Sequence, residues 1–389
     1  MDVMAQRVQG FGTTIFTEMT NLANEHGAIN LGQGFPDFEA PAFIKEAART
    51  AVEADVNQYA PGRGQPRLRD AIAATMERRY GLAVDGGSEV VVTHGATEAL
   101  FAAMMSQVNP GDEVILFEPY YDAYVPDVEM AGGVPRYYPL EPPVWRIDKE
   151  KLASLFNEKT RLIVVNSPHN PTGKVYDEDE LALIADLCKK HDVVAITDEV
   201  YEYITFDGTV HRPLASLPGM RERTITISSA GKTFSVTGWK VGWAVAAPPL
   251  AEAVFRAHQF ITFSGAAPLQ EATAVALETA EAHGYYEALQ ATYEQKRDFL
   301  ASALDAGGLP PITPRGTYFI MVDISGLDFG DDVAFCRHLT TEVGVAAIPP
   351  SAFYTTPGGG ETVARFAFCK TDEALAEAAK RLQRWRGNQ

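Results

Sequence analysis

The sequence predicts an α/β protein: a large domain with a mostly parallel sheet between helices, and a smaller α+β domain. In the middle of the chain, short and continuously apolar runs alternate with stretches of helical periodicity. Such runs are typical of parallel strands that helices cover on both faces. From about residue 286 the pattern changes, and 389 residues are too many for one ordinary core. We therefore expect a large domain over 45–285 and a smaller one formed by 1–44 and 286–389.

The strands of the large domain are predicted from runs of aliphatic and β-branched residues. The first lies at 89–92, and small and apolar residues at helical spacing predict a helix near 96–108. Asp177 begins an acidic, capping-type sequence, and an apolar helical stripe follows it. The further strands expected in this domain are 113–117, 161–165, 193–196, 224–227 and 242–245.

The C-terminal part has a different order of elements. A helical stretch begins near residue 286 and leads to a strand over 317–324. Helices and strands are mixed here without a regular βαβ alternation, which favours an α+β arrangement. The remaining expected elements are a helix near 331–343, strands at 345–348 and 363–368, and a terminal helix at 372–385.

The composition argues against several classes of partner. A net charge of −18 would repel nucleic acid and anionic lipid. No apolar run approaches the ~20 residues needed to cross a bilayer. The first residues show no basic segment followed by an apolar one, so we expect no secretory signal. The three cysteines lie far apart and the histidines show no ligand spacing, which predicts no metal site and a cytoplasmic protein.

Reactive side chains follow directly after the predicted strands. Ligands of open α/β sheets bind beyond the carboxyl ends of the strands, so these residues should meet at one edge. They comprise a helix start suited to an anion, an aromatic face, amides, a carboxylate, a phenol, hydroxyls and an amine. Pyridoxal phosphate (PLP) needs this set: an imine-forming lysine, a carboxylate at the pyridine nitrogen and a phosphate cradle. The segments are 94–97, 118–121, 166–171, 198–201 and 228–232.

Four motifs in this order resemble fold-type I, PLP-dependent aminotransferases of class I/II. The chain is most similar to the branch of kynurenine and glutamine transaminases and bacterial methionine aminotransferases. The resemblance extends from about Gly12 to the C-terminal helix. It implies an L-amino acid and a 2-oxo acid as substrates, and a homodimer with shared active sites. The motifs are NLGQGFPD (30–37), NSPHNPTG (166–173), DEVY (198–201) and SAGKTFSVTGWK (229–240).

The same resemblance implies roles for residues of these motifs and for several residues outside them. Lys232 would carry PLP as a Schiff base and move the proton of the reaction, which requires a partly deprotonated amine. Asp198 would keep the pyridine nitrogen protonated. The ring hydroxyl oxygen would be bound by Tyr201 and Asn170, and the ring face by Tyr121. The phosphate would be held by Ala96, Thr97, Ser229, Lys240 and, from the neighbouring subunit, Tyr59.

Arg365 lies in an apolar strand and should therefore be paired with an anion. Strand alternation places it on the face opposite Phe366 and Phe368. The resemblance implies that the anion is the substrate α-carboxylate, although a structural carboxylate is an alternative from the residues alone. The residues implied to assist in substrate binding are Gly34, Asn166, Asn170 and Phe16, with Phe263 as a further candidate.

The choice of substrate depends on a stretch that lacks charge. Dicarboxylate-specific relatives use an extra arginine from the partner subunit, and the matching stretch 262–268 contains none. This favours a neutral or aromatic donor of the methionine, aromatic, glutamine or kynurenine type. A dicarboxylic or N-acyl amino acid aminotransferase stays open, since Arg63 lies near Tyr59 in the sequence.

Three functions other than transamination are alternatives. Cysteine-conjugate β-lyases share every residue named above, so that alternative stays open. A P-loop NTPase is disfavoured, because the glycine that Walker A requires five residues before Gly231 is Thr226. A PLP-fold regulator without catalysis is disfavoured as well, because Lys232 and Asp198 are both present.

Overall fold

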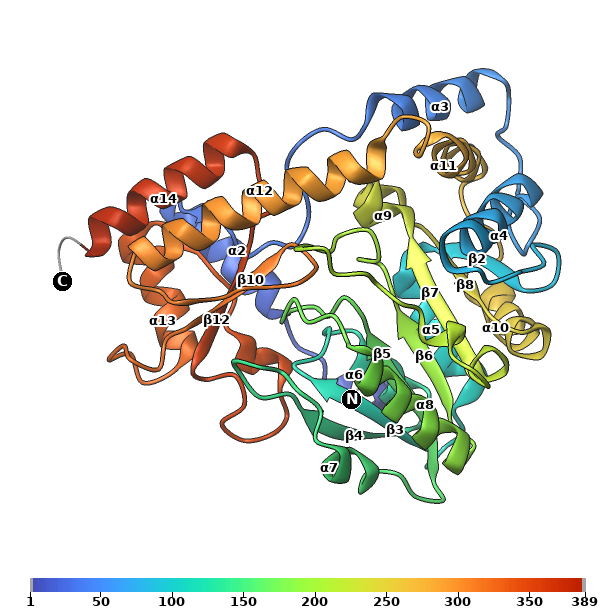
Figure 1. Cartoon of the computed structure of the whole chain (residues 1–389), viewed down its shortest axis with the longest axis horizontal. Coiled ribbons are helices and arrows are strands. Elements are labelled where there is room, and N and C mark those ends of the chain that lie inside the picture. Colours follow the sequence, from blue (N-terminus) through green and yellow to red (C-terminus); the bar gives the residue numbers. More distant parts are fainter. Residues whose placement is uncertain (1–2, 387–389) are drawn as a thin grey trace.

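A seven-stranded sheet forms the centre of the larger lobe, in a computed structural model that describes residues 3–386 (Figure 1). Only β8 runs antiparallel to its neighbours, so the predicted mostly parallel sheet is confirmed. In pairing order the strands are β2 (Val90–His94), β8 (Val241–Val245), β7 (Thr224–Ser229), β6 (Val194–Asp198), β5 (Thr160–Asn166), β3 (Glu113–Glu118) and β4 (Val134–Pro139).

Strand β4 was not predicted from the sequence. It is the edge strand beside β3, and most of its residues are partly or fully exposed. Pro135 and Pro139 interrupt its run of β-type residues. Proline is tolerated at a sheet edge because one side of an edge strand needs no ladder hydrogen bonds. The same prolines hide the strand from a search for apolar runs.

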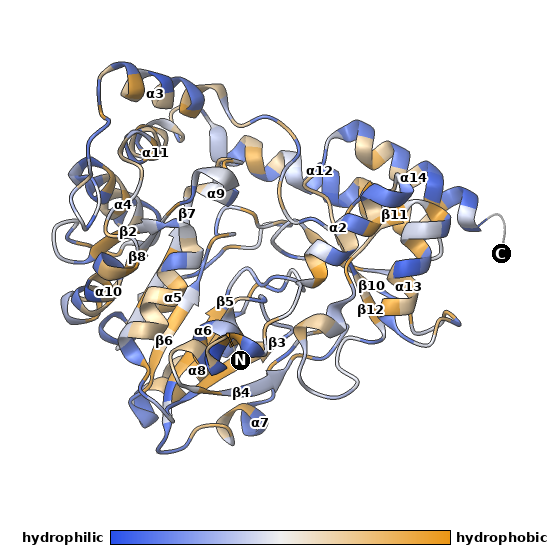
Figure 2. Ribbon diagram, turned by 180° about the vertical axis from the view of Figure 1, so that it is seen from behind, coloured by the Kyte–Doolittle hydropathy of each residue, from blue (hydrophilic) through white to orange (hydrophobic). Residues whose placement is uncertain are grey.

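Helices cover both faces of this sheet. Helix α5 (Gly95–Gln107) packs on one face together with Leu162 and Val164 of β5, whereas α8 (Glu178–His191) packs on the other with Ile163 and Val165. Successive strand side chains point to opposite faces, so an entirely apolar strand serves both layers. Figure 2 shows the apolar strands enclosed between helices whose outer surfaces are more polar.

The predicted capped start of α8 is confirmed. The Asp177 carboxylate accepts the backbone N–H of Glu180 at 2.9 Å, and the Glu180 carboxylate accepts the backbone N–H of Asp177. Other helices of this lobe were not predicted, and three of them begin with a proline in the first turn, where its missing N–H costs nothing. They are α3 (Ala42–Glu53), α4 (Pro66–Tyr80), α6 (Tyr124–Met130), α7 (Lys149–Ala153), α10 (Pro248–Ile261) and α11 (Ala267–Thr279).

The smaller lobe contains two short sheets and several helices. In one sheet β10 (Phe319–Asp323) lies between β12 (Val363–Ala367) and β9 (Pro311–Ile312), all antiparallel. In the other, β1 (Ile29–Asn30) pairs in parallel with β11 (Val345–Ala346). The predicted helix near 331–343 is α13 (Asp332–His338) followed by a π-helical turn. The remaining helices of this lobe are α2 (Ile15–His26), α12 (Tyr285–Ala306) and α14 (Asp372–Arg386). The short helix α1 (Gln6–Gln9) lies instead against α6 of the larger lobe.

The two lobes share one hydrophobic cluster. Tyr201 and Tyr203, which follow β6 of the large sheet, pack with Tyr293 of α12 and with Tyr318 and Phe319 at the start of β10. In Figure 1 the long helix α12 runs from the larger lobe across the smaller one. The expected domain boundaries stay a prediction, and residues 1–2 and 387–389 lie outside the described part of the chain. Within the described part, no helix is both long and apolar enough to span a membrane.

Candidate active site

The carboxyl ends of β2, β5, β6 and β7 border a cavity of about 340 Å³. It is the place where the sequence predicts that the reactive side chains meet. Apart from Tyr59 and the further candidate Phe263, the predicted site residues all line this cavity: Phe16, Gly34, Ala96, Thr97, Tyr121, Asn166, Asn170, Asp198, Tyr201, Ser229, Lys232, Lys240 and Arg365.

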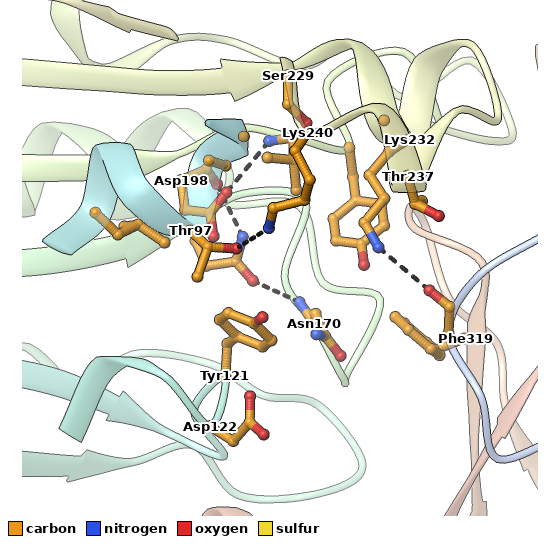
Figure 3. A pocket seen from close by; sticks show the side chains of 18 of the residues that line it. Thr97, Tyr121, Asp122, Asn170, Asp198, Ser229, Lys232, Thr237, Lys240 and Phe319 are labelled. Carbon is orange, nitrogen blue, oxygen red and sulfur yellow. Dashed lines mark hydrogen bonds between the residues drawn. The ribbon is translucent and has the colours of Figure 1, made fainter. Parts of the chain in front are cut away.

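Lys232 reaches the cavity from the short helix α9 (Ala230–Thr233), which begins directly after β7. Its Nζ donates to the carbonyl oxygen of Gly34 at 3.2 Å (Figure 3). Burial of the amine lowers its pKa to about 8, and the opposing attraction of Asp198 does not cancel this effect. An amine with such a pKa is deprotonated in a substantial fraction of molecules near neutral pH, so it can act as a nucleophile and as a base.

Asp198 is the last residue of β6, and its carboxylate is held by a tyrosine. The Tyr124 hydroxyl of α6 donates to Oδ2 at 2.7 Å. Burial raises the pKa of Asp198 to about 6, although the hydrogen bond from Tyr124 opposes this rise. Oδ1 accepts the backbone N–H of Val200 at a long 3.4 Å. Because Oδ1 is only weakly bonded, this buried carboxylate is suited to a cationic N–H partner, which would restore the ionised form.

An anion cradle lies where α5 begins. Ala96 and Thr97 are in the first turn of this 13-residue helix, whose N–H groups lack intrahelical partners. Lys240 donates from Nζ to Thr97 Oγ1 at 3.1 Å, as Figure 3 shows. Strand β8 approaches this turn so closely that a Cβ on Gly242 would lie 2.4 Å from the carbonyl carbon of Gly95. Only glycine permits this approach, which brings a cation to the helix N-terminus.

Arg365 of β12 is a buried guanidinium without a carboxylate partner in residues 3–386. Its Nη2 donates to the carbonyl of Gly32 at 2.7 Å and its Nη1 to Oδ1 of Asn170 at 3.3 Å, but the buried Nε has no acceptor. The guanidinium lies over the rings of Phe319, at 4.3 Å, and Phe16, at 5.1 Å. Burial lowers its pKa to about 10. A buried cation with an unused donor is suited to bind a carboxylate ligand.

Asn166 makes hydrogen bonds within the protein, and its expected role in substrate binding stays a prediction. Its Nδ2 donates to the backbone carbonyl of Asp198 at 2.8 Å, and its Oδ1 accepts the backbone N–H of Asn170 at 2.7 Å. Both polar atoms of the side chain therefore hold neighbouring loop residues in position. Gly34 likewise uses its carbonyl within the protein, accepting from Lys232 and from the Tyr318 hydroxyl at 2.6 Å.

Tyr59 lies outside the cavity of its own chain. Its side chain is 85% exposed and contacts the edge of Phe263, with ring centroids 5.6 Å apart. Phe263 is 52% exposed and does not line the cavity of this chain either. Tyr59 and Phe263 form an exposed aromatic pair on the larger lobe, and Phe260 of α10, three residues before Phe263, is 88% exposed.

Sequence reasoning missed several cavity residues. It also missed Tyr124, which is not among the lining residues but donates to Asp198. Tyr124 lies three residues after Tyr121, so it returns to the same side of the chain, and that spacing is a signal that could have identified it. Among the missed cavity residues, Asp122 directly follows the predicted segment 118–121 and Thr237 lies inside the motif 229–240, so their segments were expected at the site. Phe319 carried no such signal, because its segment meets the cavity only through the fold. Within residues 3–386, no group of three or more His, Cys, Asp or Glu side chains is placed to hold a metal ion.

Comparison with known proteins agrees with this geometry. Residues 26–382 match the family described as aminotransferase class I and II. The chain is 43% identical to a kynurenine–oxoglutarate transaminase of Dictyostelium discoideum, covering 96% of this chain and 94% of the relative. It is 45% identical to a probable N-succinyldiaminopimelate aminotransferase of Mycobacterium tuberculosis, covering 97% of each. A solved structure of Escherichia coli YbdL, reported to have a methionine aminotransferase function, has a TM-score of 0.95 at 43% identity, covering 98% of this chain and 99% of that one.

Proposed function

This chain belongs to the class I and II aminotransferase family and is an aminotransferase, and on that premise we propose its cofactor, its substrates and the roles of its residues. The proposed reaction moves the amino group of a neutral or aromatic L-amino acid, of the methionine, aromatic, glutamine or kynurenine type, to a 2-oxo acid. The proposed cofactor is PLP. One observation carries the proposal: a depressed-pKa lysine, a buried carboxylate and an unpaired arginine line one cavity.

The residues of the cavity are suited to the three ends of PLP. Lys232 would take the aldehyde, Asp198 the protonated pyridine nitrogen, and Lys240 with the start of α5 the phosphate. Asp198 supports this assignment because its buried carboxylate retains only the Tyr124 hydroxyl as a side-chain partner. When bound, PLP supplies an aldehyde and an electron-withdrawing ring, which makes the α-carbon proton of an amino acid acidic.

Lys232 is proposed to move that proton. Its Nζ, with a pKa of about 8, can accept a proton from the α-carbon and return it to a neighbouring carbon. Arg365 is proposed to bind the α-carboxylate through its guanidinium, including the Nε that has no acceptor within residues 3–386. Binding the carboxylate at Arg365 orients the amino acid, and Asn170 steadies the guanidinium through Oδ1. Tyr201, whose ring packs against Tyr318, is proposed to bind the ring hydroxyl of the cofactor.

The donor class is proposed from the character of the cavity walls. Phe16, Phe319 and Tyr121 present aromatic surface, and Arg365 is the sole arginine among the lining residues of the described chain. The names of the relatives support neutral or aromatic donors, namely methionine and kynurenine. The name of the M. tuberculosis relative keeps an N-acyl amino acid donor as the second candidate. A cysteine-conjugate β-lyase activity would use the same residues and remains an alternative.

A homodimer in the cytoplasm is also proposed. The exposed aromatic pair of Tyr59 and Phe263, together with the exposed Phe260, supports an interface, because exposed apolar side chains commonly mark association sites. In such a dimer Tyr59 would reach the phosphate of the neighbouring subunit. The three cysteines are buried and free, which is compatible with a reducing compartment.

The proposal is tested by mixing the PLP-loaded protein with single amino acids and following the cofactor absorbance. Methionine, glutamine, kynurenine and aromatic amino acids should each convert the bound cofactor to its amino form. Lys232→Ala should lower turnover at least ~10²-fold, as expected for a lost general base, whereas the exposed Lys190→Ala should not. Borohydride reduction and peptide mapping should place the label at residue 232. Label elsewhere, or near-normal turnover of Lys232→Ala, would refute the assignment.

A further inference from the structure

Asp122 is a charged side chain that lines the cavity but has no role in the proposed reaction. The charged residues lining the cavity are Asp122, Asp198, Lys232, Lys240 and Arg365. Four of them serve the cofactor or the α-carboxylate. Asp122 makes no hydrogen bond or ion pair with another side chain in the part of the chain between residues 3 and 386, and no dashed line reaches it in Figure 3.

The position of Asp122 separates it from the phosphate cradle. It directly follows Tyr121 in the loop between β3 and α6, and its side chain is half-buried. In Figure 3 it lies on the far side of Tyr121 from Thr97 and Lys240. It therefore lines the part of the cavity away from the proposed phosphate site.

Arg365 and Asp122 act on one another through the cavity without forming an ion pair. Burial raises the pKa of Asp122, and the positive charge of Arg365 opposes that rise. A bound α-carboxylate would neutralise Arg365 by pairing with it. The negative charge of Asp122 would then act uncompensated on whatever side chain the substrate carries. The other nearby walls, Phe16 and Phe319, are apolar and contribute no charge.

We propose that Asp122 is the residue that selects the substrate side chain: it excludes a second carboxylate and accepts a hydrogen bond from a neutral side chain that bears N–H, such as a carboxamide or an aromatic amine. The inference rests on the proposed function, because it takes Arg365 as the site of the α-carboxylate. The 2-oxo acid occupies the same cavity. Neutral 2-oxo acids are therefore accepted in preference to short dicarboxylic ones.

Two variants separate the charge of Asp122 from its ability to accept a hydrogen bond. Asp122→Asn removes the charge, so kcat/KM for glutamate relative to methionine should rise about 10-fold or more, the scale of one like-charge repulsion in a partly buried site. Asp122→Leu removes the acceptor, so kcat/KM for glutamine relative to methionine should fall about 5- to 10-fold. Glu129→Gln, an exposed carboxylate on α6, is the control and should leave both ratios unchanged.

The outcomes distinguish this inference from the function beneath it. If the unaltered protein converts methionine but Asp122→Asn leaves the glutamate-to-methionine ratio within about twofold, the selective role is wrong and the aminotransferase assignment survives. An equal loss for every amino acid in both variants would also overturn it, because it would make Asp122 a structural residue. If the unaltered protein converts no amino acid, the proposed substrates fail and this inference fails with them.

Discussion

Tyr124→Phe is the sharpest test of how this cavity would hold a cofactor. The Tyr124 hydroxyl donates to Asp198 at 2.7 Å, and its ring is buried against the edge of Tyr121, with centroids 5.6 Å apart. Phenylalanine keeps the ring and its packing but deletes the donor. The change therefore alters the carboxylate of Asp198 without opening a large cavity.

The expected effect follows from the strength of one hydrogen bond to a charged group. Such bonds contribute about 1.5–3 kcal/mol. Without the Tyr124 hydroxyl the pKa of Asp198 rises further above its present value of about 6, because burial is then less opposed. The ionised carboxylate would bind the protonated pyridine nitrogen less well. We expect PLP affinity to fall about 10- to 100-fold, at 1.4 kcal/mol for each factor of ten.

The measurement is a titration of the cofactor-free protein with PLP, followed by absorbance. Tyr176→Phe is the matched control, because the Tyr176 hydroxyl is also buried but has no hydrogen-bond partner. The control should bind PLP normally. An unchanged dissociation constant for Tyr124→Phe, or an equal loss in the control, would show that Tyr124 does not support Asp198 in cofactor binding.

Further predictions concern Asp198, Arg365 and Tyr59. Burial raises the pKa of Asp198 to about 6 in the folded protein, above its ordinary value in the unfolded chain. The free energy of unfolding is therefore higher below pH ~4, where Asp198 is protonated in both states, and it falls as the pH rises through about 6. Asp198→Asn should therefore stabilise the cofactor-free protein by up to about 3 kcal/mol at pH 7–8 but not at pH 4, and it should weaken PLP binding. Thermal melting at the two pH values measures the stability change, and an equal gain at both would contradict the prediction. Arg365→Lys should raise KM for amino acids about 10- to 100-fold and leave PLP affinity nearly unchanged, and a collapse of PLP affinity instead would make Arg365 a cofactor residue. Mixed Tyr59→Ala and Lys232→Ala subunits should regain about a quarter of the activity through hybrid dimers with one intact site, whereas no recovery would refute a shared site.

Much of the site was predictable because strand ends are local features. The apolar runs of β5, β6 and β7 are readable from composition, and each ends at the residue where its polar segment begins. Parallel strands bring such ends to one edge, so the sequence predicts that Asn166, Asp198 and Ser229 lie together, as they do in the cavity. The resemblance supplied the remaining roles, including that of Arg365.

Other features depend on which segments become neighbours. Arg365 meets Asn170 across 195 positions of sequence, and Gly32 across 333. Asn166 could be placed at the cavity from its strand end, but its actual partners, the backbone groups of Asp198 and Asn170, follow from how β5 pairs with β6 and how the next loop turns. Periodicity does not encode such pairings, because they are set by the packing of the whole chain.

The sequence by itself determined the layered α/β architecture, the order of the reactive motifs and the sheet edge at which they gather, since all three follow from local patterns of apolar and polar residues. Tertiary structure alone decided that Tyr124 supports Asp198 and that Asp122 lines the cavity. It also decided that, among residues 3–386, neither Arg365 nor Asp122 forms an ion pair with another side chain. The physical reason is that the energy of a buried charge depends on every group around it. Those groups come from distant parts of the chain, and only the folded arrangement specifies them.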